Sequence, residues 1–478
     1  MSTPVRRAVA LGVCSWLVAG SAAVGALATA GRAEAVPRPD IAGIPVVTPR
    51  DSEPSSPVPM KQKSKCAVSA TFAGSDFDRT APANLAFDVP ALHRFSTGDG
   101  VTVAVIDSGV EPNDRLPRLR GGGDYITSTN GLTDCDHHGT LIAGIIGAAP
   151  SRDDGFVGVA PGASLISIRQ TSAAYEPANR DDGESSSTLS TLARAVVHAA
   201  TLGAKVINLS VTACVSTGTS IDDDLSKALR WAVKDKDVVV VASAGNSTES
   251  NSSSCKQNPG FDPANGGDPR NWQGVKTVSM PSYFSPLVIS VGGASLTGEV
   301  YPGTLTGPWV DVAAPAERIV SLDPAKSSGG LVNAQAGKEG PEQIAGTSFA
   351  AAYVSGLAAL IRSRWPSLTA TQVRERIVNT AATPSLQQQN AFGRGLVDPV
   401  AALSAPGAPQ AREDGPRSKS MTMPEPGISD RWIKTMVALG GLGTVIVAAA
   451  VIVGWHRLRT NRENELILSA SKKGKVTR

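Results

Sequence analysis

Three short runs of this 478-residue chain carry side chains that together could perform nucleophilic catalysis. Asp107 lies in Asp-Ser-Gly, His138 in His-Gly-Thr and Ser348 in Gly-Thr-Ser. A carboxylate that orients an imidazole, an imidazole that accepts a proton and a hydroxyl that attacks a carbonyl are the groups a serine hydrolase needs. One such run occurs by chance, so the hypothesis depends on all three and on their order along the chain.

Each of these residues is predicted to lie at the end of a secondary-structure element. Residues 101–106 are apolar and largely β-branched, which is typical of a buried parallel strand, and they place Asp107 at its carboxyl end. Residues 139–149 predict a helix that begins beside the histidine. Residues 344–356 predict a glycine turn followed by a buried helix. Ser348 is therefore expected at a helix N-terminus, where free N–H groups favour developing negative charge.

A fourth run, residues 238–246, predicts another buried strand that ends in a Gly-Asn turn. The carboxamide of Asn246 can donate a hydrogen bond to the oxyanion of a tetrahedral intermediate, together with the backbone N–H of Ser348. Taken singly, Asp107 could instead form a turn and Asn246 could fill a left-handed turn position. The neighbouring His137 lacks the following Gly-Thr, so we expect a surface or capping role for it.

The four residues, in this order and context, resemble the subtilisin family of serine peptidases over residues 98–403. The resemblance implies that Ser348 is the nucleophile and that His138 is the general base and later the acid. It implies that Asp107 holds the imidazole tautomer and that Asn246 is the oxyanion donor. The fold implied is α/β and three-layered, with a mainly parallel sheet flanked by helices.

Substrate-binding positions depart from the family pattern. The resemblance assigns substrate contacts to Ser186, Ser210, Val211 and Thr212. The family usually has glycine at the position of Thr212, so its β-branched side chain is expected to narrow the first specificity pocket. Ser186 lies in a polar stretch where the family has a strand that pairs with extended peptide. The helix after the nucleophile also differs, with Phe349, Ala352 and Tyr353 in place of Met, Pro and His.

Three segments fall outside the family pattern. Residues 170–187 and 322–343 are polar insertions too long and too rich in Gly, Ser and Pro for ordinary connections. The second precedes the nucleophile turn, and we expect it to form a wall of the cleft that selects substrates or docks a partner. Residues 36–90 are expected to form a strap around a peptidase domain at 91–405, either stabilising that domain or partly covering the site.

Both ends of the chain predict export and membrane attachment. Residues 1–35 have arginines, an apolar stretch and small-x-small sites, which predict a signal peptide cleaved after Ala30 or Ala35; an uncleaved anchor is the alternative. Residues 435–455 carry no charge and are long enough to span a bilayer. We therefore expect a linker at 406–434, a single transmembrane helix at 435–455 and a cytoplasmic tail at 456–478, with the catalytic domain outside the cytoplasm.

Cysteine usage agrees with export. Cys66, Cys135, Cys214 and Cys255 allow three pairings, of which we favour Cys214–Cys255, because both follow strands expected to be neighbours, and hence Cys66–Cys135. Their spacing lacks a paired Cys-x-x-Cys, and no clear calcium ligand set is present, so we expect neither a metal nor a cofactor. The net charge of +3 argues against nucleic acid as a partner.

Together the signal, the cysteine-bearing extension, residues 330–335, the run 346–356 and the single C-terminal span resemble the mycosins. These are membrane-anchored subtilisin-like peptidases of type VII secretion systems. The resemblance implies limited proteolysis of exported proteins and association with the secretion membrane complex. A structural role in that complex, with proteolysis dispensable, is the alternative. A general degradative protease is a third possibility, which the membrane anchor and crowded cleft disfavour.

Overall fold

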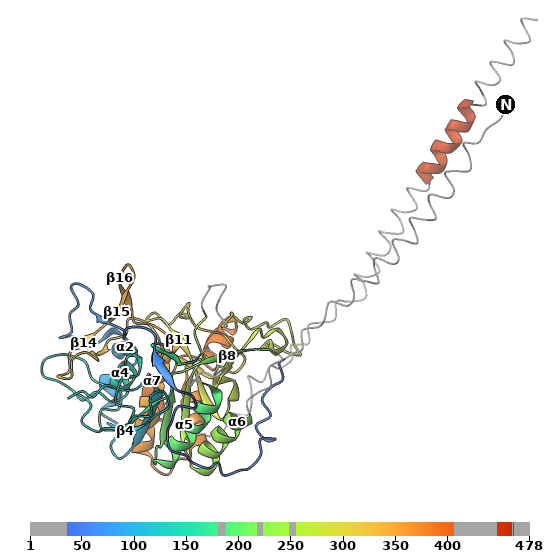
Figure 1. Ribbon diagram of the computed structural model, residues 1–478. Helices are drawn as coiled ribbons and strands as arrows, with labels where there is room; N and C mark the ends of the chain where they lie inside the picture. Colours follow the sequence, from blue (N-terminus) through green and yellow to red (C-terminus); the bar gives the residue numbers. More distant parts are fainter. Residues whose placement is uncertain are drawn as a thin grey trace, which may run out of the picture. The chain divides into compact units, whose positions relative to one another are not determined.

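The computed structural model describes residues 36–179, 188–217, 223–247, 255–405, 447–460 and 462. The chain divides into two compact units, Met1–Ala411 and Arg412–Arg478. The first unit is built around a parallel sheet with helices packed against it (Figure 1).

Seven parallel strands form this sheet in the order β12-β11-β9-β7-β3-β5-β4. Every residue of β7 and β9 is buried, as expected for a parallel sheet whose two faces are covered. The predicted parallel α/β architecture is thus confirmed. The strands are β3 (Thr102–Asp107), β4 (Leu119–Asp124), β5 (Ser164–Arg169), β7 (Val206–Leu209), β9 (Val239–Ser243), β11 (Val288–Ala294) and β12 (Val312–Pro315).

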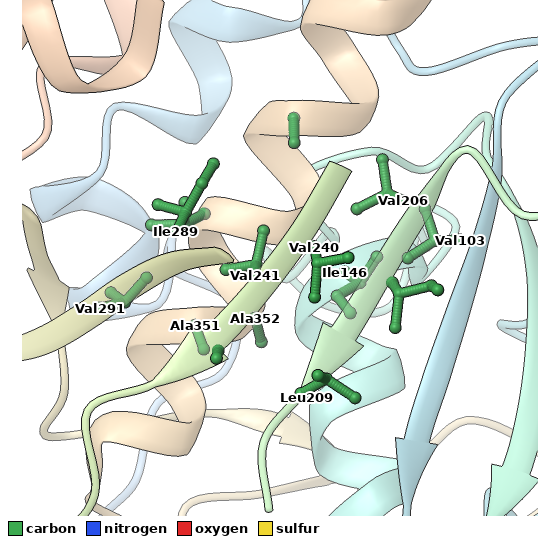
Figure 2. Close-up of a cluster of buried hydrophobic side chains, with 14 of the residues drawn as sticks. Val103, Ile146, Val206, Leu209, Val240, Val241, Ile289, Val291, Ala351 and Ala352 are labelled. Atoms are coloured by element: carbon green, nitrogen blue, oxygen red, sulfur yellow. The ribbon is translucent and has the colours of Figure 1, made fainter. Parts of the chain in front are cut away.

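Helices α4 (His138–Gly147) and α7 (Thr347–Arg364) pack against each other and against the sheet. Figure 2 shows Ile146 of α4 and Ala351 of α7 among the valines of the central strands. Nearly all of α7 is buried, because it is apolar or small around its whole circumference. Helices α5 (Leu189–Thr201) and α6 (Asp223–Arg230) form a second packed pair.

Shorter elements complete the first unit. The remaining helices are α2 (Pro82–Ala86), α3 (Val89–Leu92), η2 (Trp231–Asp235), η3 (Trp272–Gly274), η4 (Ser282–Phe284), α8 (Ala370–Thr380), η5 (Leu386–Gln388), α9 (Gln389–Phe392) and α10 (Pro399–Ser404). The remaining strands are β1 (Met60–Gln62), β2 (Ser69–Ala70), β6 (Tyr175–Pro177), β8 (Ala213–Ser216), β10 (Thr277–Met280), β13 (Ser321–Leu322), β14 (Leu331–Val332), β15 (Ala334–Gly337) and β16 (Gly340–Gln343).

The insertion at 322–343 is more regular than its Gly- and Ser-rich sequence predicts. It contains the antiparallel pairs β13–β14 and β15–β16, and the second hairpin stands out from the first unit in Figure 1. A tight turn joins β15 to β16, and Gly340 in that region has a φ of 132°, which glycine tolerates. Strand β2 pairs with the other edge of β15. Long-range pairing, which local sequence does not reveal, therefore orders this insertion.

The N-terminal segment, residues 36–90, contacts the domain that the rest of the first unit forms, along much of its length. Its strand β1 pairs with β6, and its strand β2 pairs with β15. The Tyr283 hydroxyl donates to the Pro37 carbonyl over 2.8 Å, and His198 Nδ1 lies 3.0 Å from Asp51 Oδ1. These contacts join the segment to several separate elements of the domain.

Both predicted disulfides are confirmed. Cys66 is bonded to Cys135, which joins the N-terminal segment to the loop before α4. Cys214, in β8, is bonded to Cys255. The backbone N–H of Ala67 also donates to the Cys135 carbonyl over 2.8 Å, so the first connection is both covalent and hydrogen-bonded.

Several predictions for the chain ends fall outside the described residues. These are the signal peptide at 1–35, the linker at 406–434 and residues 435–446 of the predicted span. Residues 447–460 form a helix. In the part of the chain that the structure describes, no helix has both the length and the apolar character needed to cross a bilayer.

Removing the Cys66–Cys135 bond by Cys66→Ser and Cys135→Ser is expected to lower the free energy of unfolding by about 4 kcal/mol. In the chain-entropy description, cross-linking residues this far apart restricts the unfolded chain by about that amount. Urea unfolding of the double variant and of wild type measures the difference. A midpoint equal to that of wild type would contradict a stabilising role for this bond.

Candidate active site

Asp107 and His138 are brought together as their motifs predict. Asp107 is the last residue of β3 and is completely buried, and His138 is the first residue of α4. The distance from His138 Nδ1 to Asp107 Oδ1 is 2.6 Å, and the same oxygen accepts a bond from the Ser108 N–H over 2.7 Å. This arrangement fixes the imidazole tautomer with its proton on Nδ1 and leaves Nε2 able to accept a proton.

Glycines in the two motifs allow this approach. A Cβ on Gly139 would lie 1.9 Å from the Gly109 carbonyl oxygen, and a Cβ on Gly109 would lie 2.1 Å from the Thr133 carbonyl oxygen. Gly109 also has a φ of 103°, a conformation that L side chains rarely adopt. The Asp-Ser-Gly and His-Gly-Thr motifs therefore need their glycines for close main-chain contact.

Ser348 lies in the first turn of α7, as predicted. It follows Gly346, which has a φ of 152° and whose N–H donates to the Ala316 carbonyl over 2.8 Å. The next residue, Phe349, packs its ring against the imidazole of His138, with 5.4 Å between the ring centroids. The start of α7 therefore lies directly beside the Asp107–His138 pair.

Asn246 binds the same turn. Its Oδ1 accepts hydrogen bonds from the Thr347 N–H over 3.0 Å and from the Thr347 hydroxyl over 3.2 Å. A backbone N–H can only donate, so the amide oxygen must face Thr347 and the NH₂ group must be the other end of the carboxamide. That NH₂ group lies beside Gly346, 3.4 Å from where a Cβ of that residue would stand.

The predicted substrate-binding residues have different surroundings. Ser210 is buried, and its hydroxyl donates to the Ser348 carbonyl over 2.9 Å, so its side chain holds the turn that bears Ser348. Val211 is partly buried against the core. The hydroxyls of Thr212 and Ser243 lie 3.0 Å apart. Ser186 lies outside the described residues.

Thr212 fills space beside the Gly-Asn turn. Its Cγ2 lies 3.1 Å from the point that a Cβ on Gly245 would occupy, and Gly245 immediately precedes Asn246. This side chain therefore packs against the turn that carries the amide.

Sequence reasoning missed a buried carboxylate, Asp134. Its Oδ1 accepts from the Ser108 hydroxyl over 2.8 Å, and its Oδ2 accepts from the Thr140 N–H over 2.8 Å and from the Thr140 hydroxyl over 2.6 Å. The Ser108 hydroxyl in turn accepts from the Gly139 N–H over 2.9 Å. Asp134 thereby connects the residue after Asp107 to the first turn of α4. Its position four residues before His138 was the one available signal.

His137 does not cap the helix with its side chain, contrary to one of the roles expected for it. It occupies the N-cap position of α4 with a φ of 62°, and its side chain makes no capping bond. Instead its Nδ1 lies 2.8 Å from the hydroxyl of Ser69 in β2. The left-handed backbone conformation turns this side chain toward the N-terminal segment.

The unusual Tyr353 of α7 also meets the N-terminal segment. Its hydroxyl donates to Asn84 Oδ1 over 2.6 Å, and its ring lies 5.1 Å from the ring of Phe87. All three residues are buried, and burial raises the pKa of the Tyr353 phenol. Asn84 and Phe87 thus contact the side chain of Tyr353, which departs from the subtilisin pattern.

Two titratable groups near α4 have altered acidity. Burial alone would lower the pKa of His138, but the charge and hydrogen bond of Asp107 outweigh it and raise the pKa above its usual 6.5. Burial raises the pKa of Asp134 to about 6, against the opposing effect of its Thr140 and Ser108 hydrogen bonds. Both groups therefore hold protons more tightly than in the unfolded chain.

Replacing Asp107 by Asn is expected to lower the pKa of His138, because the attraction between carboxylate and imidazolium is lost. In wild type the raised pKa adds to the free energy of unfolding below pH 6.5, and this contribution is lost as the pH rises through the folded-state pKa. A histidine NMR titration, assigned with His138→Gln, measures the shift. The exposed Asp114→Asn serves as control, and an equal pKa in both variants would contradict the prediction.

Comparisons with known proteins agree with this geometry. Residues 98–395 match the subtilase family, Peptidase_S8. Mycosin-1 of Mycobacterium tuberculosis is 46% identical over 435 residues, which cover 88% of this chain and 94% of that protein.

Solved structures give the same result. The MycP3 protease from the type VII (ESX-3) secretion system has a TM-score of 0.71 at 45% identity, with 78% of this chain and all of that chain covered. A chain in the periplasmic assembly from the ESX-5 inner membrane complex has a TM-score of 0.70 at 39% identity, with 80% of this chain and 98% of that chain covered. This protein therefore belongs to the mycosins, within the subtilase family, and is a subtilisin-type serine protease.

Proposed function

We propose that Asp107, His138 and Ser348 form the catalytic triad of this protease and that Asn246 is a donor of its oxyanion hole. The observation that carries the proposal is the 2.6 Å bond between Asp107 and His138, beside the helix start that bears Ser348. The Ser348 hydroxyl attacks the peptide carbonyl while His138 Nε2 takes its proton. His138 then returns that proton to the leaving amine, and Asp107 stabilises the imidazolium that exists between the two steps.

Two hydrogen-bond donors stabilise the negative charge that develops on the attacked carbonyl oxygen. One is the NH₂ group of Asn246, whose other end is occupied by Thr347. The second is the backbone N–H of Ser348, in the first turn of α7, where helical N–H groups have no preceding carbonyl within the helix. Both donors belong to buried or hydrogen-bonded elements, so little reorganisation accompanies the reaction.

The substrates proposed are exported proteins, cleaved at few sites. The substrate contacts assigned to Ser210, Val211 and Thr212 lie in a segment whose Ser210 binds the Ser348 carbonyl, and Thr212 takes up volume beside the Gly-Asn turn. A pocket reduced in this way accepts small side chains more readily than large ones. Ser186 is assigned to the same substrate cleft from its family position alone.

The place proposed for this activity is the outer face of the cytoplasmic membrane. Residues 1–35 act as the export signal, 36–90 as a strap on the peptidase domain at 91–405, and 406–434 as a linker. The uncharged stretch 435–455 spans the bilayer once, which leaves 456–478 in the cytoplasm. The two disulfides support an oxidising, extracytoplasmic location for the catalytic domain.

Association with a type VII secretion membrane complex is part of the proposal. The similarity to a chain of the ESX-5 periplasmic assembly supports it, and it also favours a second function as a structural component of such a complex. A variant that lacks the proposed nucleophile but still supports secretion would assign the proteolytic and structural functions to different surfaces.

Ser348→Ala is expected to abolish peptide hydrolysis and labelling by a fluorophosphonate probe, because the attacking oxygen is removed from an otherwise unchanged helix start. Asn246→Ala is expected to lower kcat by about 10²–10³, the effect of losing one oxyanion donor. Probe labelling and peptide turnover of the two purified full-length variants, compared with wild type, measure both effects. Retained hydrolysis in Ser348→Ala would refute the triad, and unchanged kcat in Asn246→Ala would refute the oxyanion assignment.

Ending the chain after residue 405 is expected to move the protein from the membrane fraction to the soluble exported fraction, because the proposed span is lost. Carbonate extraction followed by immunoblotting measures the distribution. A chimera in which an unrelated apolar helix of about 20 residues follows residue 434 restores membrane attachment. A truncated protein that stays in the carbonate-washed membrane would contradict the proposed anchor.

A further inference from the structure

A pocket separate from the Asp107–His138 pair lies between the N-terminal segment and the insertion at 322–343. Its volume is about 320 Å³, which falls at the lower end of the range of ligand-binding sites. We call it the flank pocket, and its principal lining residues are Phe72, Phe77, Phe156, Arg318, Leu331 and Gln343. Both segments that form it lie outside the ordinary subtilisin pattern.

The walls of the flank pocket are held in place by hydrogen bonds. The Phe72 N–H donates to Asn333 Oδ1 over 3.0 Å, and Asn333 Nδ2 donates to the Ser75 hydroxyl over 2.7 Å. Farther along, the Gly155 N–H donates to the Phe77 carbonyl over 2.7 Å. The turn that forms one wall is thus fixed at both ends, so the pocket exists before any ligand arrives.

The pocket combines apolar side chains with polar and charged ones, among them two arginines, Arg79 and Arg318, and one carboxylate, Asp76. Phe156 and Leu331 are buried in its lining, while Phe72 is 38% exposed. Arg79 makes an exposed ion pair with Asp76 over 3.0 Å, a kind of contact that contributes little and exchanges readily.

Arg318 differs from Arg79. It is exposed, and its side chain makes no hydrogen bond or ion pair with any residue that the structure describes. Its φ of 51° is unusual for a residue other than glycine. An unpaired guanidinium at the rim of a preformed apolar pocket is suited to bind a carboxylate in a planar, two-point contact.

The flank pocket is connected to the nucleophile turn. Gln343, on its rim, lies five residues before Ser348 in the sequence. The Ile319 N–H donates to the Ile344 carbonyl over 3.3 Å, which joins the residue after Arg318 to the residue after Gln343. One short stretch of main chain, residues 343–348, therefore joins the pocket to the helix start that bears Ser348.

We propose that the flank pocket binds a segment of the protein substrate in which an aromatic side chain is flanked by carboxylates. The aromatic ring enters the apolar lining and the carboxylates pair with Arg318 and Arg79. This proposal rests on the proposed proteolytic function and adds a substrate class to it. A protease with such a second contact selects proteins by a sequence at some distance from the bond it cleaves.

Fluorescence polarisation on the full-length Ser348→Ala protein tests the proposal without cleavage. The probes are a fluorescein-labelled peptide with one Phe between Asp and Glu residues, and the same peptide with Asn and Gln in their place. Arg318→Gly removes the cation at a backbone conformation that glycine adopts freely, so the variant retains the fold. Arg152→Gly removes an exposed arginine outside the pocket and is the matched control.

The acidic peptide is expected to bind about fivefold more weakly to Arg318→Gly than to the control, and the neutral peptide is expected to bind both equally weakly. Equal binding of the two peptides to the control, or equal affinity of the acidic peptide for both variants, would overturn the proposal. Fluorophosphonate labelling of the two variants with Ser348 intact tests the triad separately. Labelling without selective peptide binding would refute the flank-pocket proposal alone. Selective peptide binding without labelling would refute the triad assignment alone.

Discussion

The geometry of the site depends on how closely the start of α4 approaches the loop after β3. The two main chains come so near that a Cβ on Gly139 would lie 1.9 Å from the Gly109 carbonyl oxygen. This approach places the imidazole of His138 within hydrogen-bond distance of a carboxylate that ends a buried strand. Asp134 then joins the same two elements through Ser108 and Thr140. Main-chain packing and the buried carboxylate of Asp134 together hold Asp107 and His138 at hydrogen-bond distance.

A second group of contacts comes from the N-terminal segment. Asn84 and Phe87 contact Tyr353 on α7, Ser69 contacts His137, and Cys66 is bonded to Cys135. The segment therefore touches both helices that carry proposed catalytic residues. One of these contacts involves Tyr353, a position at which this chain departs from ordinary subtilisins, so that side chain and the segment pack together.

The residue pattern of the sequence predicted the strand and the helices that carry the proposed catalytic residues. The strand ending at Asp107, the helix starting at His138 and the helix bearing Ser348 all lie where periodicity and glycine placement put them. Both cysteine pairings were also predicted, because the strands before Cys214 and Cys255 were expected to be neighbours.

Apart from the two disulfides, the long-range contacts of the structure were not predicted. The hairpin formed by β15 and β16 pairs through β15 with β2, which lies much earlier in the chain. The partnership of Asn84 with Tyr353 and the role of Asp134 become visible only when separate segments are brought together. The flank pocket is of the same kind, since neither of its two walls suggests a cavity by itself.

The aromatic ring of Phe349 has a chemical consequence for the lifetime of the protease. In most subtilisins the residue after the nucleophile is Met, whose thioether is converted by peroxides to a polar sulfoxide. Here a hydrocarbon ring packs against the imidazole instead, and it contains no sulfur to oxidise. Oxidants that convert a thioether to a sulfoxide therefore find no thioether at the residue that follows the proposed nucleophile, Ser348.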